Sequence, residues 1–258
     1  VTATVTVTED HLRPSDVVVD AQSYTTGSSN ANGVLEAGED VVLAPSWGNI
    51  GGAAQSVTGG LTSFTGPGGG TYQVLDAAAS YGSIPAGATR SCTSSGDCFG
   101  LRLGQPVSRP THWDATAVEQ LGGGRTRTWT LHIGDSFADV PRSHWAYRFI
   151  ETIFHNRVTS GCNAEPFSYC PGTTLTRAEM AVLVLMAKHG PDYVPPLSSG
   201  TVFSDVPIDH WAGDFIEQLA AEGITGGCAP SMYCPTGIVT RAEMAVFLTS
   251  TFDLQLND

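Results

Sequence analysis

The sequence predicts a multidomain protein with an N-terminal all-β sandwich and a C-terminal all-α module of helical repeats. From about Val17 to Ile133, short apolar runs alternate with clusters of Gly, Ser, Pro and Asn, and helical periodicity is absent. From Phe137 to Leu248 one series of motifs occurs twice in the same order. A sequence repeat of this kind marks a supersecondary unit that the chain builds twice.

The predicted domain boundaries follow these changes in pattern. The chain divides into an N-terminal strand or linker at 1–12, a sandwich at 13–135, a first repeat at 136–190, a Pro- and Ser-rich linker at 191–202 and a second repeat at 203–258. The first eight residues, VTATVTVT, alternate in polarity like a strand with one apolar face. Such a strand belongs to the sandwich or to a preceding domain, or it is an arm that adds to the sheet edge of a neighbouring subunit.

Seven strands are expected in the N-terminal region. They are Val17–Val19, Val41–Trp47, Gln55–Phe64, Tyr72–Leu75, Phe99–Leu103, Ala115–Gln120 and Thr126–Ile133. Short strands separated by turn signals over this length predict two packed sheets. The passages NANGVLEAGEDVVLAPSWGNIG and YGSIPAGA resemble immunoglobulin-like (Ig-like) accessory domains of bacterial secreted proteins, a resemblance that implies no activity.

Each repeat is expected to contain two helices. The first covers about Trp145 to Val158 and its counterpart, with apolar residues at helical spacing. The second begins at T-R-A-E, where Thr176 and Glu179, like Thr240 and Glu243, have the spacing of a capping box. The second helices are expected to bury Met180, Leu183, Val184 and Ala187 in the first repeat, and Met244, Phe247 and Leu248 in the second.

The six cysteines fall into three close pairs. We expect the disulfides Cys92–Cys98, Cys162–Cys170 and Cys228–Cys234, because the last two pairs occupy equivalent places in the two repeats. Disulfides indicate an oxidising compartment, so the protein is predicted to be extracellular. A metal site is the alternative interpretation, but no C-x-x-C spacing occurs.

The charge of the chain limits its partners. The formal net charge is −13 and Lys188 is the single lysine, which argues against nucleic acid or an anionic membrane as partner. No apolar run is long enough to span a bilayer. We identify no catalytic motif: Gly134-Asp135-Ser136 spells the start of an esterase motif but lacks the strand-to-helix turn that such a nucleophile requires.

The repeats resemble a known family. Each has an F-x-D-V…H-W-A opening, a G-I/V-x-x-G middle and a T-R-A-E helix start, as in FADVPRSHWA and FSDVPIDHWA. These motifs are similar to those of the S-layer homology repeat, which anchors extracellular proteins to cell-wall polymers. The family commonly arranges three repeats around a pseudo-threefold axis, whereas two are visible here. The missing surface is therefore either absent or supplied by another polypeptide.

The resemblance also nominates binding residues. In the family the arginine of T-R-A-E helps to bind an acidic, often pyruvylated, wall polysaccharide between repeats, which implies this role for Arg177 and Arg241. The alternative is an internal salt bridge to a residue such as Asp139 or Asp205. The aromatic candidates are Trp145 and Trp211, which either present faces to a sugar or, as we prefer, anchor the core, with His144 and His210 positioning the helix start.

One loop has the spacing of a calcium-binding loop. Counted from Ser28, oxygen-bearing side chains stand at the ligand positions, glycine is sixth and glutamate is twelfth. The predicted ligands are Ser28, Asn30, Asn32, Glu36 and Glu39. A plain Asn-Gly turn between strands accounts for the loop equally well, since no helices flank it.

These observations predict a non-enzymatic protein of the bacterial cell surface that its repeats anchor to cell-wall polysaccharide. One alternative is a structural subunit of a surface array or filament, which assembles through the repeats and the N-terminal strand and so binds other copies of itself. Another is the C-terminal accessory region of a secreted hydrolase. Calcium is the only cofactor expected.

Overall fold

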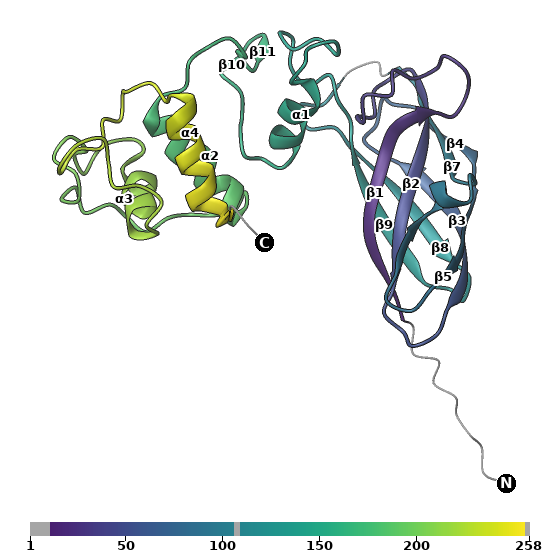
Figure 1. The fold of residues 1–258 in the computed structure, drawn as a ribbon. Coiled ribbons are helices and arrows are strands. Elements are labelled where there is room, and N and C mark those ends of the chain that lie inside the picture. The colour runs from purple at the N-terminus through teal and green to yellow at the C-terminus, as the bar shows by residue number, and fades with distance from the viewer. Residues whose placement is uncertain (1–10, 106–108, 256–258) are drawn as a thin grey trace. The chain divides into compact units, whose positions relative to one another are not determined.

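The computed structural model describes residues 11–105 and 109–255 (Figure 1). The chain divides into two compact units between Ser136 and Phe137. The strand predicted at residues 1–8 lies outside the described residues. Each unit is presented by itself below.

The N-terminal unit consists of two antiparallel sheets (Figure 1). One has the order β1-β2-β7-β4 with β6 paired to β2, and the other has the order β5-β3-β8-β9. The strands of the first sheet are β1 (Leu12–Ser23), β2 (Glu39–Asn49), β4 (Tyr72–Asp76), β6 (Thr89–Ser91) and β7 (Phe99–Leu103). Those of the second are β3 (Gln55–Thr65), β5 (Ala78–Ile84), β8 (Asp114–Leu121) and β9 (Thr126–His132). The all-β prediction for this region is confirmed, while the Ig-like resemblance stays a prediction.

Two strands were not expected from the sequence. The strand β5 has the sequence AASYGSI and β6 has the sequence TRS, and neither contains the run of β-branched residues that signals a strand. Their place comes from pairing, since β5 adds to β3 and β6 adds to β2. The edge strand β1 tolerates Pro14, which cannot donate a ladder hydrogen bond.

The core of this unit contains a buried carboxylate. Glu119 is fully buried and accepts hydrogen bonds from Trp47 Nε1 at 3.2 Å, Trp129 Nε1 at 2.8 Å and the Tyr81 hydroxyl at 2.5 Å. Burial raises the pKa of Glu119, and the three donors partly offset that effect. One carboxyl group therefore satisfies the polar atoms of three large aromatic residues inside an apolar core.

The C-terminal unit corrects the prediction of an all-α module. Its described residues, 137–255, contain four short helices: α1 (Tyr147–His155), α2 (Arg177–His189), α3 (Gly213–Ala221) and α4 (Arg241–Phe252). The segments between them are long, and one contains the two-stranded sheet of β10 (Asn163–Ala164) and β11 (Phe167–Ser168). Glycines with positive φ, prolines and the cysteine pairs fill these segments, which excludes helix there.

Three of the helices, α2, α3 and α4, share a core, to which α4 contributes Phe247. Ala181, Val184 and Leu185 of α2 pack with Ile216 and Leu219 of α3 in one buried cluster. The segment predicted as a linker is held against α3, because Asp214 accepts the N–H of Ser198 and Glu217 accepts those of Ser199 and Gly200. Among the described residues, no helix is long and apolar enough to cross a membrane.

Several predicted core positions are instead at the surface. Ala187 and Leu248 are exposed, and Phe149 is 66% exposed. The helix α1 begins two residues after Trp145, so the predicted apolar stripe was too wide. A helix this short buries only the residues on the side that faces its neighbours.

Candidate functional site

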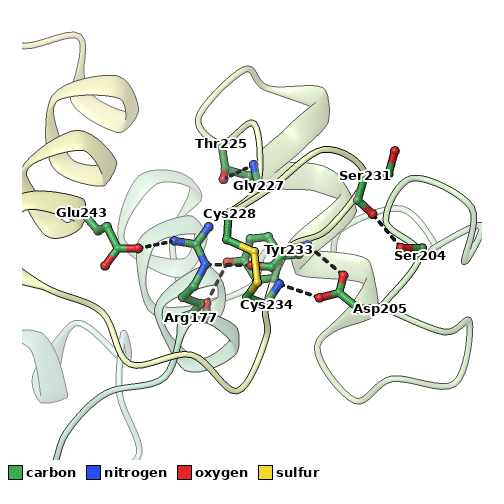
Figure 2. Close-up of a disulfide and its surroundings, with 10 residues drawn as sticks. All are labelled: Arg177, Ser204, Asp205, Thr225, Gly227, Cys228, Ser231, Tyr233, Cys234 and Glu243. Atoms are coloured by element: carbon green, nitrogen blue, oxygen red, sulfur yellow. Dashed lines mark hydrogen bonds and ion pairs between the residues drawn. A yellow bond between two sulfur atoms is a disulfide. The ribbon is translucent and has the colours of Figure 1, made fainter.

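The aspartate of the F-x-D-V motif shapes the disulfide loop of its repeat. The Asp205 carboxylate accepts the backbone N–H groups of Tyr233 at 2.8 Å and Cys234 at 2.7 Å (Figure 2). Asp139 accepts the N–H groups of Tyr169 and Cys170 at the same distances in the first repeat. The carboxylate of each aspartate therefore accepts two backbone N–H groups of its loop, which explains why the F-x-D-V motif contains an aspartate.

The loops are closed by disulfides. The structure contains Cys162–Cys170 and Cys228–Cys234 in the repeats and Cys92–Cys98 in the β unit. A short covalent loop of this kind stabilises the fold chiefly by restricting the unfolded chain.

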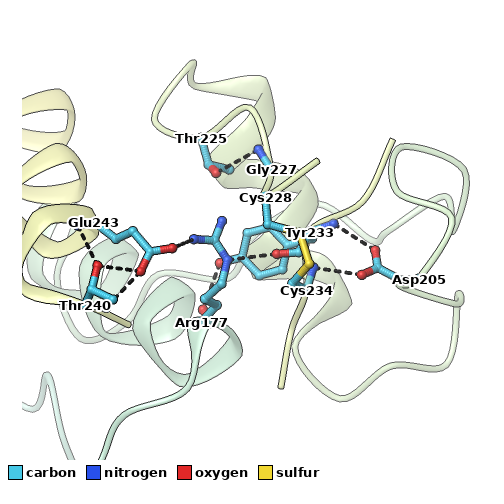
Figure 3. Close-up of polar contacts among 9 residues, drawn as sticks. All are labelled: Arg177, Asp205, Thr225, Gly227, Cys228, Tyr233, Cys234, Thr240 and Glu243. Carbon is cyan, nitrogen blue, oxygen red and sulfur yellow. Dashed lines mark hydrogen bonds and ion pairs between the residues drawn. A yellow bond between two sulfur atoms is a disulfide. The ribbon is translucent and has the colours of Figure 1, made fainter. Parts of the chain in front are cut away.

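The second helix of each repeat begins at a complete capping box. The Thr176 hydroxyl accepts the N–H of Glu179, and the Glu179 carboxylate accepts the N–H of Thr176. Thr240 and Glu243 make the same pair of bonds at α4 (Figure 3). Each cap satisfies two helix-terminal donors and fixes where the following arginine leaves the helix.

Arg177 joins the first repeat to the second. Its Nε donates to the carbonyl oxygen of Tyr233 at 2.8 Å, and its Nη1 lies 3.0 Å from Glu243 Oε1 (Figures 2 and 3). The guanidinium lies over the rings of Tyr233 and Phe247, at 4.8 Å and 5.4 Å from their centroids. In return, the Tyr233 hydroxyl donates to the carbonyl oxygen of Arg177 at 2.7 Å.

The backbone completes this contact. Arg177 N–H donates to the Gly237 carbonyl at 2.8 Å, and Val239 N–H donates to the Leu175 carbonyl at 3.0 Å. We call this set of contacts, between the start of α2 and the segment from Tyr233 to Phe247, the inter-repeat joint. Within it Arg177 is 5% exposed and Tyr233 is fully buried.

The electrostatics of the joint follow from its geometry. Burial raises the pKa of Tyr233, so its hydroxyl stays protonated and acts as a donor. The hydrogen bonds from the backbone and hydroxyl of Thr240, together with the charge of Arg177, lower the pKa of Glu243. Arg177 is therefore a structural residue here, and its ion-pair partner is Glu243 rather than Asp139 or Asp205.

Arg241 lies in a different environment. It is exposed, and among the described residues its guanidinium has no hydrogen-bond or ion-pair partner. The two arginines occupy equivalent positions in the sequence, but Arg177 is buried between the repeats whereas Arg241 is a cation on the surface.

The two tryptophans of the H-W-A motifs are surface residues, which corrects the preference for the core. Trp145 is 86% exposed and Trp211 is 66% exposed. The His144 ring stacks beside Trp145 with an interplanar angle of 27°, and His210 does the same beside Trp211. Each repeat therefore presents a histidine–tryptophan platform, defined as His144–Trp145 or His210–Trp211.

The histidines hold these platforms in place. His144 Nδ1 accepts the N–H of Ala146 at 3.2 Å, and His210 Nδ1 accepts the N–H of Ala212 at 3.1 Å. Ala146 and Ala212 are the residues from which α1 and α3 begin. The histidine thus takes the place of a side-chain cap and orients the ring beside the indole.

The predicted calcium loop contributes two of its five residues to a group of acids. Carboxylate oxygens of Asp20, Glu36 and Glu39 lie within 4.8 Å of one another, and all three residues are buried. The Asn30 and Asn32 side-chain oxygens instead accept N–H groups of the turn, and Ser28 Oγ donates to the carbonyls of Thr25 and Asp40. Three carboxylates are ligands that calcium prefers, and calcium at this loop stays a prediction.

Sequence reasoning missed Asp20, Tyr233 and the role of Glu243. A signal existed for the tyrosine, because Tyr-Cys-Pro occurs in both repeats at Tyr169 and Tyr233. Asp20 had no such signal, since it lies in β1, before the first position of the calcium-loop spacing.

The chain is similar to known proteins over its repeats. A family model described as the S-layer homology domain matches residues 202–245. An S-layer protein of Bacillus licheniformis is 36% identical over 64 residues, which cover 25% of this chain and 7% of that protein. Exoglucanase XynX of Acetivibrio thermocellus is 28% identical over 114 residues, which cover 43% of this chain and 10% of that protein. The matched regions are thus a tenth or less of the length of these two relatives.

Among solved structures, a FixG-related protein of Vibrio parahaemolyticus has a TM-score of 0.27 and 10% identity, covering 48% of this chain and 96% of that one. S-layer homology domains bind cell-wall polysaccharide and anchor proteins at the cell surface. Residues 202–245 are such a domain, and the chain is an extracellular cell-surface protein that carries it.

Proposed function

We propose that this chain is a non-enzymatic anchor that binds cell-wall polysaccharide through its two histidine–tryptophan platforms. The observation that carries the proposal is the exposure of Trp145 and Trp211 at equivalent places in the two repeats. A large indole left in water at one site is unremarkable, but the same exposure at both copies of a motif points to a contact surface.

The chemistry of the platforms suits a sugar. The face of an indole is a broad apolar surface that packs against the C–H groups of a pyranose ring, and its position is fixed here by the hydrogen-bonded histidine. Stacking does not require positive charge, in agreement with a chain of net charge −13. Two platforms on one chain also allow a repeating polymer to be held at two points, which raises the overall affinity.

Arg177 does not contribute a charge to this surface, because the inter-repeat joint buries it. Arg241 is exposed, so of the two T-R-A-E arginines it is the one that can bind acidic groups of a polymer. Salt dependence separates the two modes of recognition, since stacking is insensitive to ionic strength whereas an exposed ion pair is screened.

Titration calorimetry with purified wall polysaccharide tests the proposal. Trp145→Ala and Trp211→Ala are each expected to weaken binding roughly tenfold, which is about 1.4 kcal/mol, and the double variant to abolish it. The matched control is Leu197→Ala, which removes an exposed apolar side chain from the segment between the repeats. All variants should unfold at the wild-type midpoint, and wild-type binding by the double variant would show that the platforms are not the site.

A second candidate is an accessory region of a secreted hydrolase. It is favoured by the similarity to Exoglucanase XynX, in which the matched segment is a small part of the protein. The length of the complete open reading frame decides between the two, because an accessory region requires a catalytic domain in the same polypeptide.

A further inference from the structure

The two repeats build one inter-repeat joint and leave the two halves of a second joint open. In the joint that forms, Arg177 is the donor, and the acceptors are Tyr233, Glu243 and Phe247. From Tyr169 onward the repeats align at a constant offset of 64 residues. That offset makes Arg241 the equivalent donor on the second repeat, and Tyr169 and Glu179 the equivalent acceptors on the first. Leu183 stands at the position of Phe247 but lacks the aromatic ring.

The open donor half lies on α4 and the segment before it. Arg241 is exposed, whereas Arg177 is 5% exposed. Apolar side chains surround it in sequence and are also in water: Ile238 is 58% exposed, Val246 is 58% exposed and Leu248 is 40% exposed. A free guanidinium beside exposed aliphatic residues is the composition of a surface that another protein covers.

The open acceptor half, on the first repeat, has the same arrangement at Glu179 as the second repeat has at Glu243. Glu243 uses Oε2 for the capping box and Oε1 for Arg177. Glu179 also uses Oε2 for the capping box, and among the described residues its Oε1 has no partner. The Tyr169 hydroxyl likewise has none in the described part of the chain. The capping box thus aims one carboxylate oxygen outward at a position where the other repeat receives an arginine.

The backbone carries the same asymmetry. Val239 N–H donates to the carbonyl of Leu175 across the joint. The equivalent donor on the first repeat, Leu175 N–H, has no hydrogen-bond partner within the described residues. An arriving repeat that copies the joint would satisfy this group together with Arg241 and Glu179.

We propose that a second copy of this chain completes the joint, with Arg241 of one copy donating to Glu179 and lying over Tyr169 of the next. Donor and acceptor carry opposite charges, and the chain itself possesses the matching surface for each half. One Arg241–Glu179 contact joins two different surfaces, so it builds either a closed ring, of which a two-fold dimer with two reciprocal joints is the smallest, or an open filament. It uses none of the platform residues. Arg241 is the one residue that it shares with the polysaccharide proposal, so the Trp145 and Trp211 variants test that proposal without touching the joint.

Charge exchange between the two halves tests this arrangement. Sedimentation velocity of the full chain, over a series of micromolar to millimolar concentrations, should show reversible association. Arg241→Glu alone and Glu179→Arg alone each place like charges at the joint and should weaken association at least about tenfold. In an equimolar mixture, every joint between the two unlike variants pairs opposite charges, so association should recover.

The controls separate this effect from misfolding and from net charge. Arg90→Glu makes the same change of charge at an exposed position of the β unit and should associate like the wild type. Because Glu179→Arg removes half of a capping box, the Glu179→Gln variant, which can still cap, is measured beside it. It should weaken association while keeping the wild-type circular dichroism.

Three results would overturn the proposal. One is a wild-type chain that stays monomeric at every concentration. Another is association that Arg241→Glu leaves unchanged. The third is a mixture of the two charge variants that associates no better than either alone.

Discussion

The guanidinium of Arg177 lies 4.8 Å from the ring centroid of Tyr233, although the two residues belong to different repeats. The arginine therefore acts as part of the next repeat's core rather than of its own. The second helix of one repeat packs with the first helix of the following one, as α2 does with α3, so the packing unit is shifted by half a repeat from the sequence motif.

Arg177 and Arg241 should differ in their effect on stability. Arg177→Ala leaves Glu243 without its partner and opens the space between Tyr233 and Phe247, so it should lower the free energy of unfolding of the C-terminal unit by about 3 kcal/mol. Arg241→Ala should change it by no more than about 0.5 kcal/mol, as expected for an exposed residue. Urea denaturation followed by far-ultraviolet circular dichroism measures both, and equal losses would contradict the burial difference.

Glu119 should be required for the β unit. Glu119→Ala leaves the indole N–H groups of Trp47 and Trp129 and the Tyr81 hydroxyl without an acceptor in the core, and we expect a loss of about 3 kcal/mol or more. Fluorescence of the buried tryptophans reports unfolding of this unit. Glu165→Ala, at an exposed position, is the control. A wild-type midpoint for Glu119→Ala would mean that the three donors find other partners.

The stability of the β unit should fall as the pH rises from about 4.5 to 8. Burial, together with the neighbouring Glu36, raises the pKa of Glu39 from an ordinary 4.5 to about 8. The folded state then holds a proton that the unfolded chain has released, so stability is greatest below the unfolded pKa and is lost toward the folded one. Each unit of pKa is worth about 1.4 kcal/mol, so without divalent ions the loss over this range should amount to several kcal/mol.

Glu39→Gln is the variant that checks this dependence. Because the amide does not titrate, the variant should show a markedly flatter midpoint of thermal unfolding over the same range of pH. A wild-type unfolding midpoint that stays constant from about pH 4.5 to pH 8 in the presence of chelator would contradict the raised pKa of Glu39.

Calcium should reverse this loss if the predicted ion binds. A divalent cation favours the charged forms of Asp20, Glu36 and Glu39, so the unfolding midpoint at pH 8 should rise on addition of calcium and fall again with chelator. Glu36→Gln should reduce the response, and magnesium should give a smaller one because it demands a more rigid oxygen geometry. An unchanged midpoint would count against calcium at this loop.

Most of the secondary structure of the β unit could be predicted from the sequence, and less of that of the C-terminal unit. Alternation of polarity located seven of the strands because side chains of a strand point to opposite faces, and the T-R-A-E spacing located both capping boxes. The prediction that Trp145 lies in the core was wrong for a physical reason. Helical spacing indicates which residues share a face but not whether that face is covered, and α1 begins only after this tryptophan.

The candidate site was less accessible to sequence reasoning. The T-R-A-E motifs are identical, yet Arg177 is buried and Arg241 is exposed, because burial depends on whether another repeat follows in space. Asp20 comes close to Glu36 and Glu39 when the chain turns back from β1 to β2, and the calcium-loop spacing, which starts at Ser28, does not include it.

The hydrogen bonds of Asp205 bear on the order in which a repeat matures. Its carboxylate gathers the backbone of Tyr233 and Cys234 without help from sulfur chemistry. The loop can therefore take its shape while the thiols are still reduced, and the disulfide then forms in a loop that already has its final conformation. A chain exported before its cysteines meet an oxidant would keep the right partners within reach, and the aspartate would serve as a template for correct pairing.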